Sequence, residues 1–359
     1  MVGMSGGVDS SVAAAVLLEQ GYDVVGITLK LWDNENEEEI TCSPADKGCC
    51  SLSDIEDARM VAFKLGIPHY VLNFKDVFRK NVVDYFAEEY LQARTPNPCI
   101  ACNRYIKMGG MLDKALTMGF DYIATGHYAR ILYNETSGRY ELHAGLSGNK
   151  DQSYALYHFT QKQLAHTLMP LGELDKETVR AIAYDRNLLT AGKPDSQEIC
   201  FIPDNDYGSF LSKYTGTAAV PGDFIDSTGK ILGRHKGIQH YTIGQRKGLG
   251  IAFGVPMFVT GISRDNNTVT LGPESEVFGT QLIAEDLNYI AIAELLAPTV
   301  VLAKIRYSAK AVSATIYPMA DGRVQVIFET PQRAITPGQS IVFYQEDGSI
   351  LGGGTICDL

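Results

Sequence analysis

The feature that most constrains this chain is a glycine-rich string at its start, placed between a short apolar stub and an apolar helical run. Residues 3–11 read GMSGGVDSS, and residues 12–18 continue as VAAAVLL. Adjacent glycines let the backbone turn tightly and approach a ligand closely. Amides at the start of a helix favour an anion there. The string therefore predicts a phosphate-binding loop in an α/β domain.

The side chains of the loop indicate which type of phosphate-binding loop this is. Ser5 and Ser10 add hydroxyl donors, and Asp9 could hold Mg²⁺ on the phosphates. No lysine occurs in the string, which excludes a Walker A loop. The string SGGVDSS resembles the pyrophosphate loop of the ATP pyrophosphatases, which split ATP to AMP and pyrophosphate. Because only Met1 and Val2 precede Gly3, we expect a truncated first strand.

The first 130 residues alternate between strand and helix patterns. Strands are predicted at 23–31, 69–74 and 122–125, and helices at 53–65, 76–91 and 103–118. Ser53 is the predicted N-cap of the first of these helices, with Glu56 completing a capping box. Such alternation predicts a parallel sheet with helices on both faces.

Beyond about residue 200 the pattern changes to short β-type runs separated by turns. The predicted hairpin turns are Pro221-Gly222-Asp223, Ser227-Thr228-Gly229, Asp265-Asn266-Asn267, Asp321-Gly322 and Asp347-Gly348. We expect a catalytic domain at 1–205, a small β-rich central domain at 206–280 and a C-terminal β-barrel at 281–359.

Composition limits the partners and the compartment. The 31 basic and 42 acidic side chains give a net charge of −11, which excludes a wholly basic footprint but leaves room for a local RNA groove. The run 33–39 is read as a solvated loop. No apolar run of about 18 residues and no signal peptide is evident, so we expect a cytoplasmic protein without a membrane partner. Seven cysteines fit a reducing compartment.

Two cysteine-bearing segments are candidates for chemistry. Cys99 and Cys102 follow two prolines, and Cys102 is predicted next to a helix N-cap, where the dipole would lower the pKa of its thiol. Cys200 lies in the string GKPDSQEICF. Cys42, Cys49 and Cys50 are interpreted as structural or inert thiols, and Cys357 is given no role.

Taken together, five strings resemble those of the bacterial tRNA-specific 2-thiouridylase family over essentially the whole chain. In order they are SGGVDS, TPNPCxxCN, GNKDQSY, GKPDSQEICF and HYTIGQRKGLGI. The resemblance implies an adenine-nucleotide hydrolase-like α/β domain, a central β-rich domain and a C-terminal β-barrel. It also implies ATP-dependent exchange of oxygen for sulfur at C2 of wobble uridine 34 in the tRNAs for Lys, Glu and Gln.

The resemblance assigns roles to matching residues. It makes Cys102 the nucleophile and Cys200 the persulfide carrier, and the expected disulfide between them needs their Cα atoms within about 7 Å. The positions that it implies contact ATP are Gly3, Met4, Ser5, Gly6, Gly7, Val8, Asp9, Ser10, Leu29 and Gly126. Those implied at the target base are Asn97, Pro98 and Cys99, and those implied at the tRNA are Lys150, Asp151, Gln152, Arg306 and Tyr307. A cysteine desulfurase or a relay protein would supply the sulfur.

Position 99 departs from the family and leaves two interpretations open. Many members carry Asp there, as a plausible acid or base; Cys99 could take the proton-transfer role with a different pKa. Alternatively, Cys99, Cys102 and Cys200 could bind an iron–sulfur cluster or Zn²⁺, which we do not favour.

Other residues are weaker candidates for RNA contact. Tyr105, Tyr154 and Tyr241 could stack on a flipped base. Strand alternation would place Lys304 and Arg306 on one face, near Lys310. His235-Lys236-Gly237 and residues 244–248 could bind phosphate. His127 follows a strand end, where open α/β sheets place ligands.

Three rival functions remain at this stage. A small-molecule synthetase with the same ATP loop would leave the loop cysteines and the β-rich half unexplained. A non-catalytic RNA-binding protein would release no pyrophosphate from ATP. A 4-thiouridine synthase would normally carry an RNA-binding domain before the ATP loop.

Overall fold

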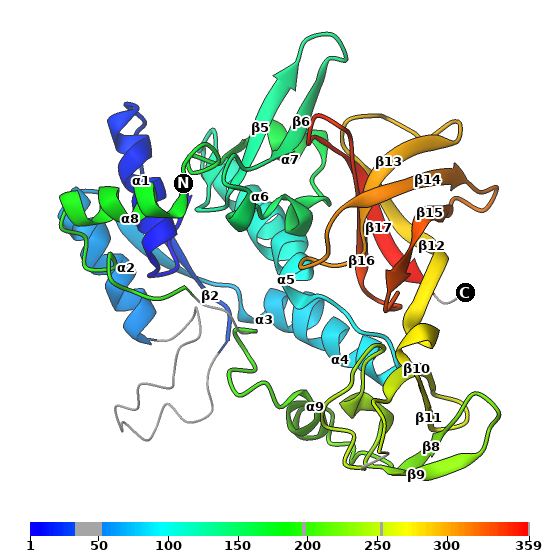
Figure 1. Ribbon diagram of the computed structural model, residues 1–359. Helices are drawn as coiled ribbons and strands as arrows, with labels where there is room; N and C mark the ends of the chain where they lie inside the picture. Colours follow the sequence, from blue (N-terminus) through cyan, green and yellow to red (C-terminus); the bar gives the residue numbers. More distant parts are fainter. Residues whose placement is uncertain (33–51, 196–198, 252–253, 358–359) are drawn as a thin grey trace. The chain divides into compact units, whose positions relative to one another are not determined.

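The computed structural model describes residues 1–32, 52–195, 199–251 and 254–357 (Figure 1). The chain forms two compact units. The first comprises Met1–Val83, Pro98–Asn205 and Asp347–Ile350. The second comprises Asp84–Asn97, Asp206–Glu346 and Leu351–Leu359. Cys42, Cys49, Cys50 and the acidic run 33–39 lie outside the described residues.

A five-stranded parallel sheet organises the first unit. Its strand order is β3-β2-β1-β4-β7. The strands are β1 Val2–Gly3, β2 Gly26–Lys30, β3 His69–Asn73, β4 Ile123–Ala124 and β7 Thr167–Leu168. Although β1 has two residues, it is central, with Val2 paired in parallel to Gly26 of β2 and Ala124 of β4. The predicted parallel sheet is confirmed, and the short first strand still pairs on both sides.

Side-chain alternation along β1 accounts for helices on both faces of this sheet. Val2 and Met4 point into a core formed with α1 Val8–Glu19, α2 Leu52–Leu65 and α8 Lys176–Asp185. A Cβ on Gly3 would instead meet the Met111 sulfur at 3.5 Å. Successive residues of a strand face opposite sides, so Met111 and its helix cover the other face.

Two long helical runs differ from their predicted starts. The first is α3 Lys75–Phe78, the wider π-helical η1 Arg79–Asp84 and α4 Tyr85–Leu91. The second is α5 Pro98–Ala101, the π-helical η2 Cys102–Met111 and α6 Leu112–Thr117. The second run was expected to start at residue 103. It starts at Pro98 because proline fits the first helical position, where its missing N–H has no partner to lose.

Smaller elements complete the first unit. They are β5 Ala129–Asn134, β6 Arg139–Ala144, η3 Gly148–Lys150, η4 Ser153–Leu156 and α7 Gln161–Ala165. The predicted N-cap at Ser53 is wrong, because α2 already begins at Leu52. One-residue shifts of this kind are common at helix ends.

The second unit holds a four-stranded sheet in the order β10-β11-β8-β9. Its elements are α9 Tyr207–Thr215, β8 Gly222–Ile225, β9 Ile231–His235, η5 Ile238–His240, β10 Phe258–Ser263, β11 Thr268–Gly272 and η6 Glu274–Val277. Ser227-Thr228-Gly229 and Asp265-Asn266-Asn267 form hairpin turns as predicted. Pro221-Gly222-Asp223 does not, because β8 begins at Gly222 and pairs in parallel with β11.

A closed six-stranded barrel follows in the same unit, in the order β12-β15-β14-β13-β16-β17. Its strands are β12 Phe278–Tyr289, β13 Thr299–Lys304, β14 Val312–Pro318, β15 Val324–Arg333, β16 Ser340–Tyr344 and β17 Ile350–Cys357. Closure leaves no exposed sheet edge. The predicted C-terminal β-barrel and the turns at Asp321-Gly322 and Asp347-Gly348 are confirmed.

No helix in the described part of the chain is both long and apolar enough to cross a membrane.

Candidate active site

The glycine-rich string forms the turn between β1 and α1. Gly6 has a φ of +70°, and a Cβ there would lie 2.3 Å from the Asp54 carbonyl oxygen, so a side chain is excluded both sterically and conformationally. Gly7 is the N-cap of α1. The Ser5 amide donates to Ser10 Oγ at 3.1 Å. These contacts hold the loop tightly against the helix start.

A cavity of about 240 Å³ opens beside this loop. Of the positions expected at ATP, those lining the cavity are Gly3, Met4, Ser5, Asp9, Ser10, Leu29 and Gly126. Gly6 and Gly7 shape the loop without lining the cavity, and Val8 is buried in the core. The remaining lining residues are Ile27, Thr28, Leu31, Lys107, Met111, Thr125, His127 and Gln152.

Gly126 brings the end of β4 against the loop. A Cβ at this position would lie 2.8 Å from both the Asp9 carbonyl carbon and the Ser10 nitrogen. Real Cβ atoms essentially never approach backbone atoms this closely. Any larger residue would therefore push the first turn of α1 away from the cavity.

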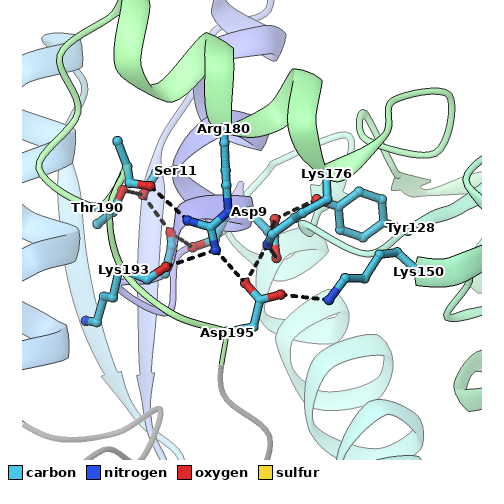
Figure 2. Close-up of polar contacts among 12 residues, drawn as sticks. Asp9, Ser11, Tyr128, Lys150, Lys176, Arg180, Thr190, Lys193 and Asp195 are labelled. Atoms are coloured by element: carbon cyan, nitrogen blue, oxygen red, sulfur yellow. Dashed lines mark hydrogen bonds and ion pairs between the residues drawn. The ribbon is translucent and has the colours of Figure 1, made fainter.

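Asp9 belongs to an ion-pair network that Lys176 connects to Asp195 (Figure 2). Lys176, the first residue of α8, donates from Nζ to Asp9 Oδ1 at 2.7 Å and to Oδ2 at 2.9 Å. The Tyr128 hydroxyl also donates to Oδ1 at 2.7 Å. Burial and this bond to Asp9 raise the pKa of Tyr128, so it keeps its proton. Two donors, Lys176 and Tyr128, therefore orient the Asp9 carboxyl group.

The same lysine reaches the segment that leads to Cys200. Lys176 Nζ lies 2.7 Å from Asp195 Oδ1, and Lys150 Nζ lies 2.8 Å from Asp195 Oδ2 (Figure 2). Arg180 adds a longer contact to Asp195 at 3.4 Å. Burial alone would raise the pKa of Asp195, but the hydrogen bonds from Lys150 and Lys176 outweigh it, so the pKa is lowered.

A second lysine binds this segment to the loop itself. Lys193 Nζ donates to the Gly6 carbonyl at 3.0 Å, to Asp54 Oδ1 at 2.5 Å and to Asp57 Oδ2 at 2.7 Å. Lys193 therefore ties the segment before Asp195 to the phosphate loop and to α2. In the motif GKPDSQEICF the sequence pointed to Cys200 alone. No local pattern marked Lys176, Lys193 or Asp195, because their partners are far away in the sequence.

The structure changes the setting of the cysteines. Cys99 is exposed and lies in the first turn of α5, whereas Cys102 is half-buried and begins η2. The predicted N-cap location of Cys102 is therefore wrong. Since the dipole acts mainly in the first turn of a helix, it favours a thiolate at Cys99 more than at Cys102.

Cys200 is half-buried, beside two residues that fix its segment to the first unit. The Phe201 ring packs on Phe78 at 5.7 Å and on Trp32 at 6.1 Å, and Ile202 is buried. Phe78 ends α3, which contacts η2, the helix that begins with Cys102. The apolar neighbours of Cys200 thus anchor its segment against α3, which contacts η2. Cys357 is buried, and its thiol donates to the Ile283 carbonyl at 3.3 Å, which fits the absence of an assigned role.

The residues expected at tRNA lie in several settings. Gln152 lines the nucleotide cavity and accepts from the Tyr128 amide, and the Asp151 carboxylate accepts from the Gly145 and Ser153 amides. Arg306 and Tyr307 lie in the turn after β13. The strand alternation predicted for Lys304 and Arg306 is wrong, because β13 ends at Lys304.

The remaining target-base and stacking candidates divide by exposure. Pro98 is buried as the first residue of α5, and Asn97 is half-buried. Tyr154 and Tyr241 are buried, so the predicted stacking on a flipped base is wrong for both; Tyr105 is 40% exposed. His235 is buried between Phe224 and Tyr241, which gives it a packing role.

The described residues contain no group of three or more His, Cys, Asp or Glu side chains placed to hold one metal ion. Asp9 is the single carboxylate of the cavity lining. Mg²⁺ is commonly bound through one or two carboxylates plus substrate phosphates. The cavity therefore fits an ion that arrives with a nucleotide better than a protein-only metal cage.

Comparisons with known proteins decide the family. Residues 1–204 match the family model described as tRNA methyl transferase HUP domain, 208–273 the tRNA methyl transferase PRC-barrel domain, and 279–356 the aminomethyltransferase beta-barrel domain. The tRNA-specific 2-thiouridylase MnmA of Acetivibrio thermocellus is 60% identical over 356 residues, covering 99% of this chain and 98% of the relative. That of Clostridioides difficile is 54% identical over 358 residues, covering 100% and 97%. The chain belongs to the tRNA-specific 2-thiouridylase family.

Membership in this family confirms the resemblance inferred from the five strings. Solved structures are more distant. NMN synthetase from Francisella tularensis is 17% identical, covering 61% of this chain and 77% of its own, with a TM-score of 0.34. The U34-tRNA thiolase NcsA from Methanococcus maripaludis with its [4Fe-4S] cluster is 19% identical, covering 59% and 65%, with a TM-score of 0.34. These scores are too low to carry an argument about this chain.

Proposed function

We propose that this protein is a tRNA 2-thiouridylase, a sulfurtransferase that replaces the C2 oxygen of wobble uridine 34 with sulfur at the expense of ATP. The observation that carries the proposal is full-length similarity to thiouridylases in a chain whose phosphate loop borders a cavity of about 240 Å³. We further propose the tRNAs for Lys, Glu and Gln as substrates, a cysteine desulfurase or relay protein as sulfur donor, and the cytoplasm as compartment.

ATP makes the base reactive. The uridine O2 forms a bond to the α-phosphorus, the bond from that phosphorus to the bridging oxygen breaks, and pyrophosphate leaves. The C2 oxygen then departs as AMP, a phosphate leaving group that titrates near about 6 rather than near about 15.7 as for water. Ser5, Ser10 and the loop amides would bind the phosphates. Mg²⁺ held by Asp9 and the phosphates would neutralise their charge.

Sulfur transfer then needs two thiols. The terminal sulfur of a Cys200 persulfide attacks C2, and AMP leaves with the electron pair of the broken C–O bond. The Cys102 thiolate next attacks the Cys200 sulfur, so the S–S bond breaks towards the base, which keeps the sulfur. A Cys102–Cys200 disulfide remains, and a thiol reductant supplies two electrons to restore both thiols. We propose Cys99, at the exposed first turn of α5, as the acid or base.

The experiment compares single cysteine variants. Purified protein is incubated with unthiolated tRNA, ATP, Mg²⁺, cysteine and a cysteine desulfurase, and both pyrophosphate and 2-thiouridine are measured. Cys102→Ser and Cys200→Ser should each lose 2-thiouridine formation and still bind ATP. Cys357→Ser, which changes a buried thiol outside the nucleotide cavity, is the control. Normal 2-thiouridine formation by either active-site variant would overturn the two-thiol mechanism.

A further inference from the structure

The nucleotide cavity contains a cation that the loop does not supply. Among the residues that line it, Lys107 is the single lysine or arginine and Asp9 the single carboxylate. Asp9 is already paired with Lys176. A triphosphate entering this cavity would therefore meet the ammonium group of Lys107 as the unmatched charge of the wall. Hydrogen bonds between a cation and phosphate are about twice as strong as those between neutral groups.

Lys107 belongs to the helix that also carries Cys102. Both residues lie in η2, whose hydrogen bonds run from residue i to i+5. Cys102 and Lys107 are five positions apart, one hydrogen-bonded turn of this wider helix. In an α-helix of 3.6 residues per turn, five positions would turn them about 140° apart. The widened helix thus brings Lys107 and Cys102 closer to one face than an α-helix would, although Cys102 is not among the residues that line the cavity.

A neighbouring imidazole lies beside the ammonium group of Lys107. Lys107 Nζ lies 3.5 Å from His127 Nε2, and His127 Nδ1 lies 2.7 Å from Thr125 Oγ1. Burial, and then the charge of Lys107, lower the pKa of His127 well below its usual range. A neutral imidazole has one donor and one acceptor nitrogen. With Lys107 donating to Nε2, Nδ1 carries the proton and donates to Thr125.

We propose that Lys107 contacts the phosphates of ATP from the cavity wall, and that His127 is its positioning residue. The inference rests on the proposed function and adds to it a phosphate contact from the helix that carries Cys102. During adenyl transfer the ammonium group of Lys107 would neutralise charge on the α-phosphate oxygens. Thr125 and His127 would hold it there without touching the substrate.

Binding in the absence of tRNA separates this role from a structural one. Calorimetry would compare adenosine with an ATP analogue whose α and β phosphorus atoms are joined by a methylene group. Lys107→Met should weaken binding of the analogue about tenfold or more, which is the usual effect of losing a hydrogen bond to a charged group. The same variant should change the affinity for adenosine less than twofold. Lys107→Arg should recover part of the loss. Lys114→Met, an exposed lysine of α6 in the same helical run, is the matched control.

His127 is tested through the balance of KM and kcat. His127→Leu removes the acceptor and should raise the KM for ATP several-fold at a similar kcat. His127→Gln keeps an acceptor and should bring the KM for ATP most of the way back to the wild-type value. Unchanged analogue binding in Lys107→Met, or equal loss of analogue and adenosine in a variant with a wild-type circular dichroism spectrum, would overturn the inference. If wild type binds the analogue but releases no pyrophosphate with tRNA, the proposed function fails instead.

Discussion

At the scale of single residues, one lysine ties the nucleotide loop to the segment before Cys200. Lys176 contacts Asp9 and Asp195 at the same time, with only 14% of its side chain exposed. Asp195 also forms an ion pair with Lys150, a residue that the family resemblance implies contacts tRNA. The Asp195 carboxylate therefore joins Lys176, which contacts the nucleotide loop, to Lys150, which was expected at tRNA.

The pKa of Asp195 makes this carboxylate testable through pH. Because its pKa is lowered in the folded protein, Asp195 stabilises the fold above its unfolded pKa of about 3.9, and this contribution is lost as pH falls through the folded value. Asp195→Asn should cost about 1–2 kcal/mol at pH 7, since the pair is partly exposed. The difference from wild type should shrink between pH 5 and pH 3.

Urea unfolding over this pH range makes the measurement. Asp185→Asn, an exposed carboxylate near the end of α8, is the control and should leave the midpoint within error at every pH. A gap between Asp195→Asn and wild type that stays constant from pH 7 to pH 3 would show that the ion pairs add no stability.

At the scale of elements, the site depends on how closely the end of β4 approaches the start of α1. Gly126→Ala adds one methyl group, which would lie 2.8 Å from backbone atoms of Asp9 and Ser10. We expect the variant to weaken binding of the methylene ATP analogue more than tenfold, because α1 and the loop must move together. Gly148→Ala has no atom within 4 Å of the added carbon and serves as control. Normal analogue affinity in Gly126→Ala would mean that the loop can shift without cost.

The elements also show what could be predicted from the sequence. The strands β2, β3 and β4, most hairpin turns and the loop followed from local signals: periodicity, Asp-Gly or Ser-Thr-Gly turns, and paired glycines. The strand β7 Thr167–Leu168 was not predicted. The start of the helix that carries Cys102 could not be predicted from local signals, because a proline at position 98 is compatible with either a stiff loop or the first turn of a helix. Lys107, Lys176 and Asp195 were not predicted as site residues, because their roles depend on partners distant in the sequence.

At the scale of the whole molecule, a protein with a net negative charge has to bind tRNA, which is itself a polyanion. The net charge is −11, so tRNA affinity has to come from local cations rather than from the overall field. We expect the affinity to fall steeply with salt concentration. Lys150→Ala and Arg306→Ala should each lower the slope of log affinity against log salt by about 0.7–0.9, the effect of one lost phosphate contact.

Filter binding at several salt concentrations, with unmodified tRNA, gives these slopes. Lys162→Ala, an exposed lysine of α7, is the control and should leave the slope unchanged. If Lys150→Ala and Arg306→Ala keep the wild-type slope, the tRNA contacts implied by the resemblance are wrong for this chain, and Lys150 serves the Asp195 network alone.

The central claim is that this protein thiolates the wobble uridine of tRNA. The most direct test is mass spectrometry of nucleosides and of the anticodon fragment, using unthiolated tRNA incubated anaerobically with the protein, ATP, Mg²⁺, cysteine and a cysteine desulfurase. The account predicts a sulfur-for-oxygen mass shift at uridine 34 that requires ATP and disappears with Cys200→Ser. An unmodified uridine 34, with neither a mass shift nor pyrophosphate release, would contradict it.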